Sequence, residues 1–184
     1  MSRPEKIYRR FVASTRGVAA IEFAMILPVL CVLFLASFDG GRAIATYMKV
    51  RSATYALAAI TNQYTTIAST DMAAILGATS QIMAPYNSAT PAVKVSQITI
   101  SNTGTAKIEW SAAAGTTARA VGSAMTLPSA LSVNGSYLIF AEVSYTYTPM
   151  FGYFGSGGIT FSDNLYVTPR SVSCIVYTPQ SSSC

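Results

Sequence analysis

Residues 16–38 read RGVAAIEFAMILPVLCVLFLASF, and this stretch decides how the chain is organised. It joins a basic arm, residues 1–17, to an apolar span, residues 18–38, in which Glu22 is the only charged residue. A helix rises about 1.5 Å per residue, so this span reaches roughly the ~30 Å thickness of the hydrocarbon core of a bilayer. We therefore predict one transmembrane helix. Because a carboxylate inside such a helix is costly, Glu22 is a candidate functional residue.

The charge distribution predicts how the chain is oriented. The arm holds five basic residues and one acidic residue, whereas residues 18–184 hold seven basic and six acidic residues. Positive flanks stay on the cytoplasmic side of a membrane. We therefore expect a single-pass protein of the inner membrane with a cytoplasmic N-terminus and a periplasmic head. The basic excess reflects this topology and does not indicate a nucleic-acid partner.

A cleaved secretory signal peptide is the alternative interpretation of the same span. The apolar region of a signal peptide has about 7–15 residues and is followed closely by an A-x-A-like site. Here the uncharged stretch Phe23–Phe38 is longer, and the nearby A-x-A, Ala43–Ala45, comes only after Asp39 and Arg42. The pattern favours a retained span.

Beyond the span the sequence predicts an amphipathic helix over residues 39–68. Apolar residues recur at spacings of three and four, typical of one buried helix face. They are Val50, Ala53, Leu57, Ile60, Tyr64 and Ile67. Gly40 and Gly41 mark the weak point between the two halves, either a hinge or a short break. Pro28 either kinks the helix or is a harmless membrane proline.

Residues 69–184 are predicted to form the head. Ser69-Thr70-Asp71 resembles a helix start, and this second helix should end before Pro85. Alternating β-branched and aromatic residues then predict antiparallel strands. The expected strands are 93–100, 107–110, 137–147, 165–167 and a closing strand at 172–176. The first of them is expected to change face near residues 96–97. Residues 111–134 are expected to form an irregular loop. The fold class is α+β: a long N-terminal helix packed on a small antiparallel sheet of about four strands. Most tyrosines are expected in the core and rim of the sheet, although a contact surface is the alternative.

Three cysteines divide by compartment. Cys31 lies in the membrane span and is expected to be a small packing residue. Cys174 and Cys184 lie in the exported part, where disulfides persist, and they are the one pair available there. We predict a bridge between them; two free thiols near the C-terminus are the alternative.

Catalysis has little support in the sequence. The chain has no histidine, which removes the commonest general base and metal ligand. It also lacks HExxH, GxSxG, P-loop and CxxC motifs. We expect no enzymatic activity, no metal and no cofactor.

Several segments together resemble a known family. Arg16–Phe23 places a glycine, then a glutamate at the fifth following position, ahead of a long apolar run, and Pro28 lies inside that run. With a Gly-Arg after the span and the later segments Ile108–Ser111 and Ala141–Pro149, the chain resembles the TadE/TadG-like pseudopilins. These proteins are minor components of the tight adherence (Flp) pilus system.

The resemblance implies specific roles for the N-terminal residues. It implies cleavage between Gly17 and Val18 by a prepilin peptidase, and assembly or register roles for Glu22 and Phe23. It also implies a major Flp-type pilin, other pseudopilins, the inner-membrane assembly platform and membrane lipid as partners. Major Flp pilins usually follow the glutamate with tyrosine and have almost no head. Phe23 and a large head therefore favour an accessory pilin-like protein.

A physical argument for a register role of Glu22 is independent of the family resemblance. Cleavage would leave Val18 with an α-amino group of pKa near 8, mostly protonated at neutral pH. In a bundle of such helices, the Glu22 carboxylate can pair with the ammonium of a neighbouring chain, which relieves the cost of both charges and sets axial register. Alternatively, Glu22 snorkels to the interface or is protonated.

Two other functions stay open. The first is an uncleaved, membrane-anchored periplasmic scaffold or binding protein, which an intact residue 1–17 arm would reveal. The second, made remote by the missing histidine, is a secreted hydrolase.

Overall fold

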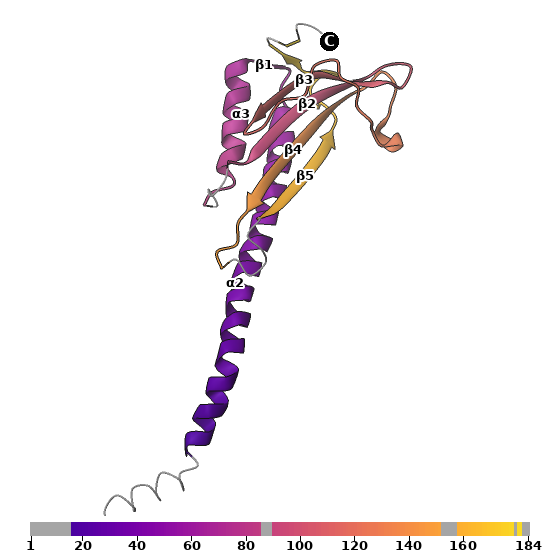
Figure 1. Ribbon diagram of the computed structural model, residues 1–184. Coiled ribbons are helices and arrows are strands. Elements are labelled where there is room, and N and C mark those ends of the chain that lie inside the picture. Colours follow the sequence, from indigo (N-terminus) through magenta and orange to yellow (C-terminus); the bar gives the residue numbers. More distant parts are fainter. Residues whose placement is uncertain (1–15, 86–89, 152–157, 179, 182–184) are drawn as a thin grey trace, which may run out of the picture. The chain divides into compact units, whose positions relative to one another are not determined.

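The computed structural model describes residues 16–85, 90–151, 158–178 and 180–181. The chain divides into two units, Met1–Arg42 and Ala43–Cys184, and helix α2 (Arg16–Thr61) contributes residues to both. The α+β prediction is confirmed: one long N-terminal helix is followed by a head with a four-stranded antiparallel sheet (Figure 1).

Helix α2 is continuous over 46 residues. Its sequence is rich in Ala, Leu and Met, which lose little conformational freedom in a helix. The helix runs through Pro28 and through Gly40 and Gly41, so the structure shows no break at the glycine pair. It ends at Thr61, seven residues before the predicted end at residue 68. Residues after Thr61 turn instead toward a short strand, β1 (Thr66–Ile67).

The second helix, α3 (Ser69–Gln81), begins where the sequence predicted and ends before Pro85. The cap differs from the expectation in detail. Ala68 is the N-cap residue, and its backbone N–H donates to the Asp71 carboxylate at 3.3 Å. An acidic side chain in the first turn also complements the positive end of the helix dipole.

The sheet has the strand order β3-β2-β4-β5, all antiparallel. The strands are β2 (Ala92–Ile100), β3 (Ala106–Ala114), β4 (Tyr137–Tyr147) and β5 (Ile159–Val167). The predicted turn between β2 and β3 is present. Gly104 has φ +79°, a conformation that glycine adopts without steric cost, and its N–H donates to the Ser101 carbonyl at 2.9 Å.

A bulge in β3 decides which face Trp110 occupies. Ile98 pairs with Ile108, but the next residue of β2, Gln97, pairs with Trp110, so Glu109 is the extra residue. Such a bulge reverses the alternation of the strand. Ile108 therefore lies in a small apolar cluster with Ile98, while Trp110 lies in the main core.

The main core lies between the helices and one face of the sheet. It joins Val50, Ala53 and Leu57 of α2 and Met72, Ile75 and Leu76 of α3 to the inner faces of β2, β3 and β4. This confirms the first three residues of the predicted helix face; Ile60 is 37% exposed. It also confirms the core role of Tyr145 and Tyr147, which are almost fully buried.

The outer face of the sheet is covered in part by the connection between β3 and β4. Met125, Leu127 and Leu131 of this connection pack against the smaller apolar cluster. The sequence predicted an irregular loop over residues 111–134. Instead β3 extends to Ala114, and a 3₁₀ turn, η1 (Ser129–Leu131), lies within the loop.

The predicted closing strand over residues 172–176 is wrong. The strand at this end is β6 (Val176–Tyr177), and it pairs in parallel with β1 in a separate two-stranded sheet. The preceding residues are held by side chains rather than by a strand ladder. The Trp110 indole N–H donates to the Ile175 carbonyl at 2.8 Å, and the Ile175 N–H donates to Gln97 Oε1 at 2.8 Å.

Candidate assembly site

The predicted cleavage site lies in the first turn of α2. The helix begins at Arg16, so Gly17 and Val18 are already helical. Nothing lies within 4 Å of the place where a Cβ on Gly17 would stand. The backbone next to the Gly17–Val18 bond is therefore open on the side where a larger residue would carry its side chain.

Glu22 stands one helical turn after Val18. Residues four apart in a helix lie on the same face, about 6 Å apart along the axis. Glu22 is exposed, and no ion pair or hydrogen bond joins it to another residue in the described part of the chain. Its carboxylate and the amine that cleavage would create thus share one stripe of the helix.

The helix surface around this pair is apolar on every side. All residues from Gly17 to Phe34 are exposed, and the exposed set includes large residues such as Phe23 at 59%, Met25 at 75% and Phe34 at 71%. A helix that is apolar all round requires a lipid or protein environment. Helix α2 is long and apolar enough from Gly17 onward to cross a membrane.

A shallow apolar hollow lies beyond Pro28. It has a volume of about 340 Å³ and is lined by Leu30, Cys31, Phe34 and Leu35. Cys31 is free and exposed, and its small side chain leaves the gap between the larger neighbours. This is the shape that a side chain of an adjacent helix fills in close packing.

The region of the glycine pair contains a charge that the sequence did not single out. Asp39 is only 2% exposed, whereas the preceding residue, Phe38, is 47% exposed. The Arg42 guanidinium lies 5.7 Å from the centre of the Phe38 ring. Gly40 and Gly41 are helical with open space around them, so their role as a hinge stays a prediction.

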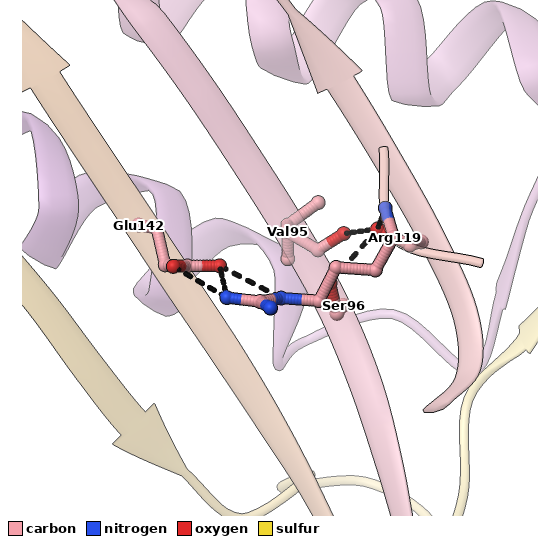
Figure 2. Close-up of polar contacts among 5 residues, drawn as sticks. Val95, Ser96, Arg119 and Glu142 are labelled. Atoms are coloured by element: carbon pink, nitrogen blue, oxygen red, sulfur yellow. Dashed lines mark hydrogen bonds and ion pairs between the residues drawn. The ribbon is translucent and has the colours of Figure 1, made fainter. Parts of the chain in front are cut away.

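In the described part of the head, a charged pair that the sequence did not predict lies on the outer face of the sheet (Figure 2). Arg119 donates to both oxygens of the Glu142 carboxylate, from Nη2 at 2.7 and 2.8 Å and from Nε at 3.1 Å. Its guanidinium also lies 5.4 Å from the centre of the Phe140 ring. This geometry fixes the loop after β3 against β4. Spacing along the chain gives no signal for it, because the two residues are 23 positions apart.

The same face holds a stacked aromatic pair. Phe140 and Tyr166 stack with ring centres 4.2 Å apart. Burial raises the pKa of the Tyr166 hydroxyl; the Glu142 carboxylate raises it further, and Arg119 lowers it. Tyr166 therefore stays protonated at neutral pH and acts here as a packing residue.

The two cysteines in the described part of the chain differ in state. Cys174 is buried and disulfide-bonded, and Cys31 is free. Cys184 lies outside the described residues, so its pairing with Cys174 stays a prediction. Among the described residues, no group of three or more His, Cys, Asp or Glu side chains could hold a metal ion.

The N-terminal segment matches a known family. Residues 17–59 match the model of the TadE-like protein family, which confirms the resemblance over most of α2. This family is related to the Tad pilus and is not known for enzymatic activity. Comparisons with curated proteins and with solved structures gave no match.

Proposed function

We propose that this chain, TadE-like over residues 17–59, is a pseudopilin that serves biogenesis of a tight adherence (Flp-type) pilus. A prepilin peptidase cuts it after Gly17, and α2 then holds it in the inner membrane with the head in the periplasm. Its partners are the major Flp-type pilin, other pseudopilins and the assembly platform. The observation that carries the proposal is the coincidence of the family match with an open glycine and an exposed carboxylate on one apolar helix.

Cleavage would change the charge at the N-terminal end of α2. It removes the basic arm, residues 1–17, and replaces it with one ammonium on Val18. That ammonium and Glu22 are of opposite sign and lie one turn apart on the same stripe. The cut chain would therefore present a dipolar end instead of a strongly cationic one.

This dipolar end supplies axial register between subunits. In hydrocarbon each charge alone is costly, and pairing lowers the cost for both. A neighbouring helix shifted by one turn places its ammonium beside Glu22. The apolar surface and the hollow near Cys31 then add packing contacts that tolerate different neighbours.

The proposal is tested by the N-terminus of the mature chain. Membrane and sheared-pilus fractions are isolated from the cells that produce it, and intact mass is measured for wild type, Gly17→Val and the control Gly77→Val. Gly77 is also helical with open space around it, so valine there controls for the substitution itself.

We expect a mature N-terminus at Val18 in wild type and in Gly77→Val, and a retained leader in Gly17→Val. Normal removal of residues 1–17 from Gly17→Val would contradict the prepilin assignment. An intact arm in wild type would support the alternative function, an uncleaved membrane-anchored scaffold or binding protein.

A further inference from the structure

The two edge strands of the sheet, β3 and β5, differ in whether other described segments cover them. The outer edge of β3 is covered. Met125 N–H donates to the Ala106 carbonyl at 3.0 Å, and Ile108 exchanges backbone bonds with Gly122 and Ser123. Further along, the Gln180 side-chain amide accepts from Ser111 N–H and donates to Ser111 carbonyl, both at 3.0 Å. Covering an edge in this way prevents pairing with another chain.

The other edge, β5, is open in the described part of the chain. It is the outermost strand beside β4 (Figure 1), and none of its residues makes a backbone hydrogen bond to any described segment other than β4. Nine residues are long for an uncovered edge, and no proline or lysine interrupts them. Long uncovered edges are templates for strand addition.

The ladder shows which backbone groups of β5 point outward. Ile100 N–H donates to the Ser136 carbonyl, so even-numbered residues of β2 bond to even-numbered residues of the β4 segment. Odd-numbered residues of β4 therefore bond to β5, which pairs Val143 with Asp163. The N–H and C=O groups that point away from β4 therefore belong to the even-numbered residues of β5, which are Thr160, Ser162, Asn164 and Tyr166.

The surface beside this edge has the composition of a protein interface. On α2, Ile44, Tyr47, Met48 and Tyr55 are between 43% and 61% exposed. Tyr47 meets Phe161 of β5 edge-on at 6.0 Å, and Arg51 interacts electrostatically with Asp163. Tyrosine, methionine and arginine are enriched where proteins bind one another.

A second copy of this chain is a poor occupant. A symmetric antiparallel pair of β5 strands in full register places Asp163, the central residue, opposite itself, and facing like charges are destabilising. Pairing of β5 with the β3 edge of a second copy is blocked because that edge is covered.

We propose that β5 receives an extended segment from a second, non-identical membrane-anchored subunit. The segment adds a fifth strand to the sheet. Its apolar side chains alternate toward Tyr47 and Met48, and its polar side chains lie beside Ser162 and Asn164. That the second subunit is membrane-anchored rests on the proposed function; the open edge does not.

Amide exchange of the purified full-length chain in detergent tests the edge itself. The amides of Thr160, Ser162, Asn164 and Tyr166 should exchange faster than those of Phe161, Asp163 and Leu165. Equal protection of both sets would overturn the proposal, because the edge would then be covered by the chain itself.

Site-specific photocrosslinking in pilus-producing cells tests the occupant. A benzophenone side chain replaces Ser162, and the control position is Lys107 on the covered edge. We expect a link from position 162 to a defined segment of a different subunit, and none between subunits from position 107. A link from 162 to a second copy, or no link, would overturn the proposal.

Proline variants test whether the crosslink from position 162 depends on backbone pairing with β5. Asn164→Pro removes an outward N–H, which an edge strand tolerates, and should lower the yield of the link by about tenfold. Asn164→Ala should keep it, and Asp163→Pro, which removes a bond to β4, should lower the thermal midpoint of the head. A folded Asn164→Pro chain with a wild-type yield would overturn the proposal. Because leader removal is measured separately, loss of the link with normal processing would leave the proposed function standing.

Discussion

The indole N–H of Trp110 donates a hydrogen bond to the backbone carbonyl of Ile175 across 65 positions of sequence. Gln97, the residue that pairs with Trp110 in the ladder, accepts from the N–H of the same Ile175. Both side chains are fully buried. Two neighbouring side chains of the sheet thus satisfy both backbone groups of one residue and fix the C-terminal segment where a strand was expected.

The first prediction concerns the hydrogen bond between Gln97 and Ile175. Gln97→Leu keeps the side-chain volume but leaves the buried Ile175 N–H without its acceptor. A buried unsatisfied donor costs about 1–3 kcal/mol, so the free energy of unfolding of the head should fall by that amount. Denaturant unfolding followed by the fluorescence of the single tryptophan measures it. Gln63→Leu in the exposed turn after α2 is the control, and an equal loss in both variants would refute the role of Gln97.

The second prediction concerns Lys49. Its ammonium donates to the Ile82 carbonyl at 3.1 Å and to the Ala84 carbonyl, just beyond the C-terminus of α3. A cation there satisfies two carbonyls of the turn that follows the helix and complements the helix dipole. Lys49→Met should lower the free energy of unfolding by about 1–3 kcal/mol.

The matched control for Lys49 is Lys107→Met. Lys107 is exposed on β3, and its methionine variant should stay close to wild type. Hydrogen exchange across Ser69–Gln81 should rise in Lys49→Met alone. If exchange in α3 is unchanged, Lys49 does not anchor that helix.

The helices and the central strand were predictable because their signals are local. The spacing of Val50, Ala53 and Leu57 identifies the buried face of a helix without knowledge of its partner. The alternation of β4 likewise separates inner residues such as Val143 from outer residues such as Phe140.

The features that the sequence did not predict depend on contacts between distant residues. The bulge at Glu109 adds one residue to a strand and leaves the composition unchanged. The pairing of Arg119 with Glu142 and the sealing of β3 by Gln180 depend on how loops return to the sheet. The closing strand was predicted from alternation at residues 172–176, but side chains of β2 and β3 replaced the ladder there.

The third prediction concerns Cys174. It is disulfide-bonded in the structure, and we expect Cys184 as its partner. Closing a loop of about ten residues should contribute roughly 2–3 kcal/mol by restricting the unfolded chain. Thiol alkylation of the native exported head should label neither cysteine until a reductant is added. Ready labelling of both without reductant would exclude the bridge and weaken the case for a periplasmic head, since such bridges persist in oxidising compartments.

The fourth prediction concerns Glu22. Glu22→Ala makes the membrane span more apolar, so insertion into the membrane and removal of the leader should be unchanged. Pilus assembly should fall sharply, because the ammonium of a neighbouring subunit loses its partner; breaking a buried ion pair costs about 3–5 kcal/mol. Electron microscopy of pili per cell, with immunoblots of the membrane fraction, measures both quantities.

A variant with the carboxylate at another position shows whether assembly needs the carboxylate on the Val18 stripe or only a carboxylate at this depth. In the double variant Glu22→Ala/Ala24→Glu the span keeps one acidic residue, but a step of two residues turns it by about 200° around the helix. The carboxylate then leaves the stripe that it shares with Val18. We expect this variant to assemble as poorly as Glu22→Ala. Wild-type pilus numbers in Glu22→Ala would show that Glu22 only snorkels to the interface, and recovery in the relocated variant would show that any carboxylate near this depth suffices.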